Sequence, residues 1–89
     1  MARITRIHYS LDFRKSYKKL AVHMQNRVDR KDALFRENPY DPSLGTHRLH
    51  GHLNRLWSFR ITREYRVLFE FIGDNEVLFY DIGTHGIYQ

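Results

Sequence analysis

The hydrophobic period changes once along this chain, and that change restricts the folds it can adopt. Apolar residues recur at helical spacing through residues 10–38, as Phe13, Tyr17 and Leu20 do at i, i+4 and i+7. From Leu56 onward, apolar and polar residues alternate with the period of two that marks half-buried strands. Because the helical part precedes the strands instead of alternating with them, the sequence predicts an α+β fold.

The helical part has a predicted start and a predicted end. Residues 3–9 are rich in β-branched and aromatic side chains and predict a first strand, after which Ser10 fits a helix N-cap. The helical spacing ends at Asn38, because the residue before a proline is disfavoured in the α region. No glycine or proline marks a break near residues 20–23, so the pattern fits a hairpin of two helices, which we favour, or one bent helix.

The strand part predicts two consecutive hairpins. A connection at residues 63–65 and a turn at residues 74–75, where Asp and Asn tolerate positive φ, join three strands. In the first hairpin the expected pairs are Ile61 with Val67, Phe59 with Phe69 and Trp57 with Phe71. In the second they are Phe71 with Leu78, Phe69 with Tyr80, Val67 with Ile82 and Arg66 with Gly83.

This register brings cations to one edge of the sheet. Arg60 and Arg66 share the face opposite the aromatic side chains, and His85 lies just past Gly83 on the strand beside Arg66. We therefore expect two guanidinium groups and an imidazole to converge there. Residues 1–89 are expected to form one domain, in which an N-terminal strand and a helical hairpin pack on one face of a small, mainly antiparallel twisted sheet.

Length and composition exclude several classes of protein. A chain of 89 residues can bury one compact core. The absence of cysteine excludes a disulfide-stapled secreted scaffold and a cysteine zinc site. No apolar run approaches the roughly 18 residues of a transmembrane helix, and the N-terminus lacks the core of a signal peptide. We expect a soluble cytoplasmic protein with no membrane partner.

Charge is distributed unevenly along the chain. The formal net charge is +5, with 11 Arg and 4 Lys. Residues 1–36 carry a net +7, residues 47–66 a net +4 and residues 70–81 a net −4. Guanidinium groups bind phosphate and carboxylate through paired hydrogen bonds. This segregation predicts a polyanion, an acidic protein or both as partners, the alternative being an ordinary solvated helix face.

The catalytic motifs that the sequence lacks limit the reactions that this protein could catalyse. The sequence has no G-x-G-x-x-G, P-loop or G-x-S-x-G motif, which removes support for nucleotide hydrolysis by those routes and for a serine nucleophile. His47, His50 and His52 could bind a metal ion, but no carboxylate or cysteine cluster completes the usual four-ligand shell. We therefore expect no metal and no cofactor.

The remaining His and Arg residues suffice for metal-free RNA cleavage. A base takes the proton of a ribose 2′-OH, a cation stabilises the phosphorane, and an acid protonates the departing 5′-oxygen. DNA lacks the hydroxyl that this reaction needs. The residues that fit these roles are His47, Arg66 with Arg60, and His85. Ordinary alternatives are a loop histidine, a frayed C-terminal histidine, and surface ion pairs of the arginines with Glu64 or Glu70.

Two segments of the strand part resemble a known family. Residues 56–69, LWSFRITREYRVLF, and residues 82–85, IGTH, are similar to the RelE/ParE superfamily of toxins from type II toxin–antitoxin modules. The order of elements agrees over nearly the whole chain, which implies a RelE-like, microbial-RNase-like fold. The first segment looks most like the YoeB branch, and the G-T-H ending resembles the YafQ branch. Both branches are ribosome-dependent mRNA endonucleases.

The resemblance implies roles for individual residues. His47 matches the position of the general base, Arg66 the arginine that stabilises the scissile phosphate, and His85 the terminal general acid. Arg60 matches a substrate-side arginine. Further residues expected to bind substrate are Arg63, His50 and Tyr88, the last by stacking or positioning.

The resemblance also implies partners. Toxins of this family are bound by an antitoxin, and an acidic antitoxin segment would fit the positive charge of residues 47–66. Free toxin is expected in the ribosomal A site, where residues 1–36 would contact rRNA phosphates with strong salt dependence while the site acts on mRNA. Two other functions stay open: a ParE-like inhibitor of DNA gyrase without nuclease activity, and a non-catalytic RNA- or antitoxin-binding module.

Overall fold

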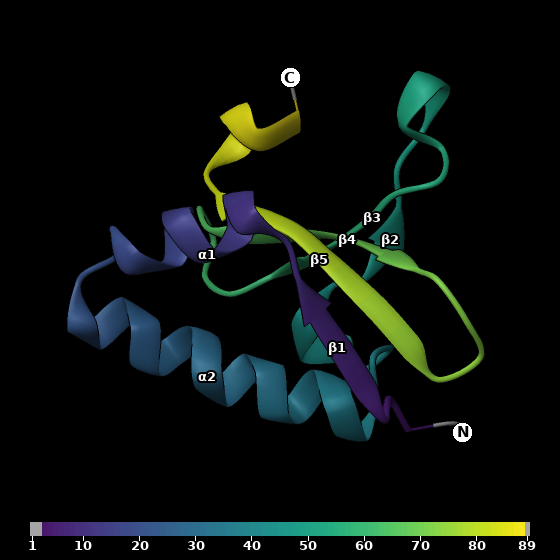
Figure 1. Ribbon diagram of the computed structural model, residues 1–89, viewed down its shortest axis with the longest axis horizontal. Coiled ribbons are helices and arrows are strands. Elements are labelled where there is room, and N and C mark those ends of the chain that lie inside the picture. Colours follow the sequence, from purple (N-terminus) through teal and green to yellow (C-terminus); the bar gives the residue numbers. More distant parts are fainter. Residues whose placement is uncertain (1–2, 89) are drawn as a thin grey trace.

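The computed structural model describes residues 3–88, and of Tyr88 the backbone alone (Figure 1). The helices are α1 (Leu11–Lys18) and α2 (Val22–Glu37), with short 3-10 turns η1 (Pro42–Leu44), η2 (Gly51–Leu53) and η3 (His85–Tyr88). The strands are β1 (Arg6–Tyr9), β2 (His47–Arg48), β3 (Trp57–Arg60), β4 (Arg66–Phe71) and β5 (Glu76–Gly83). They form one sheet in the order β1-β5-β4-β3-β2, parallel between β1 and β5 and otherwise antiparallel, which confirms the predicted α+β fold.

The helical part is a hairpin of two helices, as predicted. The Ser10 hydroxyl oxygen caps α1 by accepting the Phe13 N–H at 3.0 Å. After α1 ends at Lys18, the side-chain amide of Gln25 in α2 donates to the Tyr17 carbonyl at 2.9 Å. The Leu20 N–H also donates to this carbonyl at 3.1 Å, and the Lys19 N–H donates to the Ser16 carbonyl at 3.2 Å. Carbonyls of the last turn are therefore satisfied while Lys19 keeps a right-handed backbone, so the break needs no glycine. Neither of these described helices is long and apolar enough to cross a membrane.

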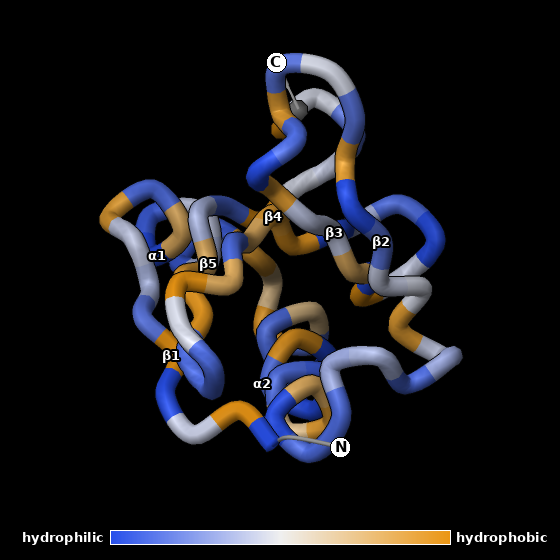
Figure 2. Tube along the Cα trace, turned by 90° about the vertical axis from the view of Figure 1, so that its right-hand side faces the viewer, coloured by the Kyte–Doolittle hydropathy of each residue, from blue (hydrophilic) through white to orange (hydrophobic). Residues whose placement is uncertain are grey.

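One phenylalanine of α2 joins the helices to the sheet. The Phe35 side chain is fully buried. Its ring centroid lies close to three rings of the sheet, at 4.7 Å from Phe59, 5.0 Å from Phe69 and 5.5 Å from Phe79. Because these rings come from β3, β4 and β5, Phe35 holds α2 against the middle of the sheet. Figure 2 shows α2 end-on beneath the strands.

The first strand hairpin differs from the prediction in its register. The predicted pairs Ile61–Val67, Phe59–Phe69 and Trp57–Phe71 are wrong by two residues. The observed pairs are Trp57 with Phe69, Phe59 with Val67 and Arg60 with Arg66. The turn is the reason: the Ile61 N–H bonds the Tyr65 carbonyl at 2.8 Å, and the Thr62 hydroxyl oxygen accepts the Tyr65 N–H at 3.1 Å. A shift of two residues leaves every side chain on its predicted face.

The second strand hairpin follows the prediction at one end. The confirmed pairs are Val67 with Ile82 and Arg66 with Gly83. A register shift between Leu68 and Phe69 makes the other predicted pairs wrong by one residue. Beyond it the pairs are Phe69 with Phe79 and Phe71 with Val77, instead of Tyr80 and Leu78. This bulge lets Val77, Phe79 and Ile82 all reach the core despite their mixed parity.

The turn before β5 also differs from the predicted two-residue turn. No non-glycine residue among those described has a positive φ, so Asp74 and Asn75 do not use the conformation that we expected of them. Asn75 instead binds the segment before β1. Its carbonyl accepts the Thr5 N–H at 2.9 Å, and its side-chain amide donates to the Arg3 carbonyl at 2.7 Å. Hydrogen bonds to the segment before β1 therefore hold this turn in place.

The two faces of the sheet have different surroundings. α2 lies below the sheet in Figure 1, and η2 and η3 rise on the opposite side, which we call the upper face. Side chains alternate along a strand, so the neighbours of the rings that pack on α2 project from the upper face. These neighbours are Ser58, Arg60, Arg66 and Leu68.

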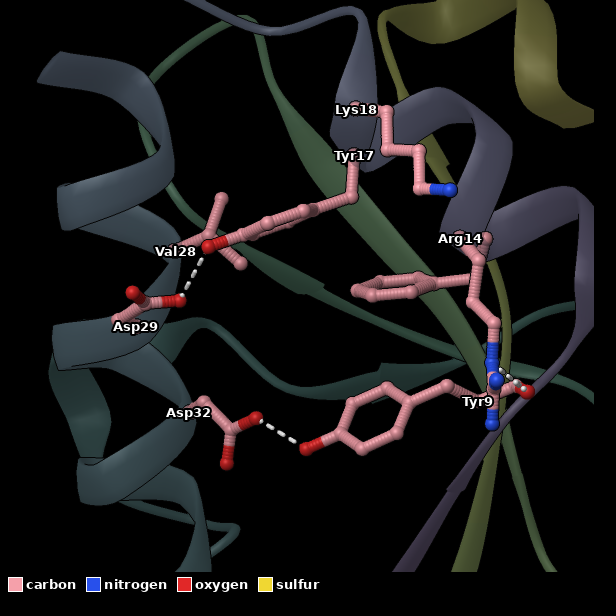
Figure 3. A pocket seen from close by; sticks show the side chains of 8 residues that line it. Tyr9, Arg14, Tyr17, Lys18, Val28, Asp29 and Asp32 are labelled. Carbon is pink, nitrogen blue, oxygen red and sulfur yellow. Dashed lines mark hydrogen bonds between the residues drawn. The ribbon is translucent and has the colours of Figure 1, made fainter. Parts of the chain in front are cut away.

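A second set of contacts connects β1 and α1 to α2. The Tyr9 hydroxyl donates to Asp32 at 2.6 Å, and the Tyr17 hydroxyl donates to Asp29 at 2.8 Å (Figure 3). A hollow of about 460 Å³ lies among these residues, with Phe13 in its lining. Tyr9 of β1 and Tyr17 of α1 thus both bind carboxylates of α2.

Tyr9 should ionise later than an ordinary tyrosine. Burial first, and then the hydrogen bond to Asp32, raise the pKa of Tyr9 from 10.0 to about 12. Because the folded state holds the proton more tightly, this contribution to stability is present below pH 10.0 and is lost as the pH rises toward 12. Ultraviolet titration, with Tyr9→Phe as the subtraction control, measures this pKa. Asp32→Asn should lower it, and an unchanged value would contradict the assignment.

Truncation of Phe35 should destabilise the fold strongly. We expect Phe35→Ala to lower the free energy of unfolding by about 3–5 kcal/mol, because it leaves a cavity among three rings. Leu11→Ala is the control, since Leu11 is 66% exposed and should change stability by about 0.5 kcal/mol or less. Urea unfolding followed by Trp57 fluorescence gives both values. A similar loss for the two variants would show that other contacts hold α2.

Candidate functional site

Two arginines face each other at the end of the β3–β4 hairpin. Arg60 and Arg66 are directly opposed in the register, where like charges destabilise a sheet. Within residues 3–88 neither forms an ion pair with Glu64, Glu70 or any other residue. Glu70 instead pairs with Arg55 at 3.7 Å. The ion-pair alternative is therefore wrong, and the two guanidinium groups can take an external anion.

More cations gather around this arginine pair. A hollow of about 310 Å³ opens at the end of the hairpin. Its lining consists of Lys31 from α2, Ser43 from η1, Arg60, Arg66, and Ile61, Thr62 and Arg63 from the turn. Four of these seven residues are cations and none is acidic, so the hollow carries a positive potential. We call it the cationic hollow.

Gly45 lies between the arginine pair and His47. Its φ of 57° is left-handed, and a Cβ placed on it would lie 3.2 Å from the Cζ of Arg60. The guanidinium of Arg60 therefore rests against the backbone of Gly45. The carbonyl of the same glycine accepts a hydrogen bond from Nδ1 of His47 at 3.0 Å. We did not single out Gly45 from the sequence, although its place at the end of a turn-rich loop was a usable signal.

His47 belongs to a short edge strand rather than to a loop. It pairs with Ser58 of β3, and its imidazole is exposed. Because a carbonyl oxygen only accepts, Nδ1 must carry the proton, which leaves the lone pair of a neutral ring on Nε2. Standard strand spacings put the Cα atoms of His47 and Arg66 about 12 Å apart, two strands across and two residues along. His47 can thus act as a base through Nε2 on the side of the sheet that holds β2.

The C-terminal turn lies on the other side of the arginine pair. Gly83 is opposite Arg66, and η3 packs against both β4 and β5, so His85 begins its turn two residues beyond that pair. A Cβ on Gly83 would lie 2.6 Å from Cγ2 of Ile87, which is a clash. Glycine therefore lets η3 fold back over β5. In the sequence Gly83 serves only to set the register, and no pattern singles out Ile87.

Of the predicted site residues, Arg60, Arg63 and Arg66 line the cationic hollow, whereas His47, His50 and His85 do not. His50 precedes η2 and His52 lies within it, both are exposed, and neither lines the hollow. Tyr88 ends η3, and its side chain lies outside the described residues. Within residues 3–88, no three His, Asp or Glu side chains gather closely enough to hold a metal ion.

Filling the space above Gly83 should disturb the C-terminal turn. Gly83→Ala is expected to lower the free energy of unfolding by about 1–3 kcal/mol, because the added methyl overpacks against Ile87. Ile87→Ala removes the opposing methyl, so the double variant should lose less than the sum of the two single losses. Thermal unfolding of the wild type, the two single variants and the double variant gives this double-mutant cycle. NMR resonances of His85 report the position of η3. Additive losses would contradict the contact.

Comparison with known proteins identifies the fold. No protein-family model matches the sequence, and no curated protein matches it significantly. YafQ from E. coli strain BL21(DE3) is 17% identical, with 92% of this chain and 94% of that chain covered and a TM-score of 0.77. The YoeB/ParE toxin from Agrobacterium tumefaciens is 18% identical, with 91% and 99% covered and a TM-score of 0.78. RelE–RelB from the archaeon Pyrococcus horikoshii OT3 is 16% identical, with 93% and 97% covered and a TM-score of 0.74. The chain therefore has the fold of the RelE/ParE superfamily toxins, as its sequence resemblance implied.

Proposed function

We propose that this protein is the toxin of a type II toxin–antitoxin module and cleaves mRNA on the ribosome. The observation that carries the proposal is the opposed Arg60–Arg66 pair, which has no carboxylate partner within residues 3–88. Two like charges are held together at a cost to the sheet, and a phosphate between them would offset that cost. His47 on one side and the turn of His85 on the other supply groups that transfer protons.

The reaction would be a metal-free transesterification. Nε2 of His47 takes the proton of the ribose 2′-OH, and the 2′-oxygen attacks the adjacent phosphorus. Arg66 and Arg60 stabilise the charge that develops on the phosphorane oxygens. His85 protonates the 5′-oxygen as its bond to phosphorus breaks. The products are a 2′,3′-cyclic phosphate and a 5′-hydroxyl end, and DNA is not a substrate.

The charge distribution supports the proposed partners. Residues 1–36, with a net +7, would dock on rRNA phosphates of the ribosomal A site, so binding should weaken steeply with salt. One of the similar solved structures is a complex of RelE with RelB. By analogy, a cognate antitoxin would bind this chain, and an acidic segment of it would neutralise residues 47–66, which carry a net +4.

The nuclease proposal predicts codon-phased cuts that depend on His85 and Arg66. Inducing the protein in cells and mapping the 5′ ends of a reporter mRNA, with and without ribosome engagement, measures them. His85→Ala and Arg66→Ala should each lower cleavage by about 10²–10⁴-fold, the range for a missing proton-transfer or charge-stabilising group. The matched control is Arg55→Ala, because Arg55 pairs with Glu70 and lies neither in residues 1–36 nor in the lining of the cationic hollow. It should keep full cleavage.

The same assay separates the assignments and the competing functions. His47→Ala should slow cleavage more than His50→Ala or His52→Ala, and equal losses would make the base assignment wrong. In a reconstituted assay with purified ribosomes, chelation of zinc in the presence of excess Mg²⁺ should leave the rate unchanged, whereas loss that zinc restores would refute the metal-free mechanism. Intact mRNA with blocked gyrase supercoiling would favour a ParE-like inhibitor. Intact mRNA with normal supercoiling and retained RNA or antitoxin binding would favour a non-catalytic module.

A further inference from the structure

Lys31 lines the cationic hollow although it belongs to the helix on the other face of the sheet. α2 packs on the lower face through Phe35, yet the Lys31 side chain lines the same hollow as Arg60 and Arg66. The hollow therefore extends from the upper face around the end of the β3–β4 hairpin toward α2. Lys31 is half-buried and forms no ion pair within residues 3–88.

Asp41, an acid close enough to feel the charge of Lys31, forms no ion pair with it. The pKa of the Asp41 carboxyl is lowered first by the hydrogen bonds that it accepts from Ser43 and only weakly by Lys31. One Asp41 oxygen accepts the Ser43 hydroxyl at 2.7 Å and the Ser43 N–H at 2.9 Å. That carboxylate is thus engaged with η1 and is not part of the lining of the hollow.

A hydroxyl in the turn adds a donor to these cations. The Thr62 oxygen accepts the N–H of Glu64 at 3.3 Å and of Tyr65 at 3.1 Å. With its lone pairs occupied, the hydroxyl can offer its proton to a ligand in the hollow. The volume of about 310 Å³ is roughly ten times the liquid volume of one water, about 30 Å³, which is room for a phosphate and part of its sugar.

We propose that the cationic hollow binds a second RNA phosphate, next to the one that is cleaved, through Lys31, Arg63 and the Thr62 hydroxyl. Arg60 lies between the two phosphates and Arg66 faces the scissile one. The inference rests on the proposed function, since it assumes an RNA substrate at the arginine pair. It gives the substrate a path that leaves the upper face at the end of the hairpin and continues toward α2.

Binding of inorganic phosphate and of a short single-stranded RNA tests this path without any cleavage. Phosphate should move the NMR amide resonances of Thr62 and Arg63 in the wild type and much less in Lys31→Gln. Lys31→Gln and Arg63→Gln should each weaken RNA binding by about tenfold, the effect of removing one charge-assisted hydrogen bond. Each should also make the plot of the logarithm of the RNA-binding constant against the logarithm of salt concentration less steep, by about 0.7 in slope, because one phosphate fewer is neutralised in the complex. We call this quantity the salt slope. Lys15→Gln is the control with the same change of charge: Lys15, like Lys31, belongs to the residues 1–36 proposed to dock on rRNA, but it is an exposed cation of α1 outside the hollow, so its loss should not alter binding of phosphate or of a short RNA.

Several outcomes would overturn this inference. Equal effects of Lys31→Gln and Lys15→Gln would make the contribution of Lys31 a general charge effect. Binding of a glutamate-rich peptide to Lys31 and Arg63, with RNA binding unaffected by their substitution, would assign the hollow to an acidic protein. The failure of the proposed function is seen separately, because it would appear as mRNA left intact by the wild type or as cleavage that survives Arg66→Ala and His85→Ala. Cleavage abolished in those variants, together with an unchanged salt slope in Lys31→Gln, would refute the second phosphate alone.

Discussion

The burial of Phe35 against rings from three strands determines which face of the sheet is covered. Since α2 is held there, alternation along β3 and β4 sends Ser58, Arg60, Arg66 and Leu68 to the upper face. The chemistry proposed for this protein therefore depends on a contact on the opposite side of the sheet, where no reacting group lies. A cavity at Phe35 would loosen the register that opposes the two arginines, and through it the site.

Two glycines let the chain approach the arginine pair from both sides. Gly45 leaves room for the guanidinium of Arg60 and bonds Nδ1 of His47, and Gly83 leaves room for Ile87 and so for the turn that begins at His85. A side chain at either position would push a proposed proton-transfer group away from the arginines. Close backbone approach at these two points lets His47 and the turn of His85 lie on either side of the arginine pair.

The site is an electrostatically unfavourable part of the fold. Opposed arginines, Arg63 and a half-buried Lys31 line one hollow with no acidic side chain among its lining residues. Two other cations near the sheet have acidic partners, Arg55 with Glu70 and His8 with Glu76. Several cations gathered in one hollow without an acidic side chain are typical of a binding site, because a ligand supplies the missing partner.

The sequence by itself determined the α+β class, the extent of the helical part, the face of each residue in β3 and β4, and the pairing of Arg66 with Gly83. It could do so because a period of two or 3.6 is a local property. The exact pairs of the first hairpin depended on the Thr62 turn. The bulge, which turns Val77 and Phe79 to the core in place of Leu78 and Tyr80, depended on the shape of the core. An even shift of register preserves every face, so alternation alone cannot detect it. The convergence of Lys31 with the arginines was decided only by tertiary structure, because it joins a helix to a turn 30 residues away that share no pattern.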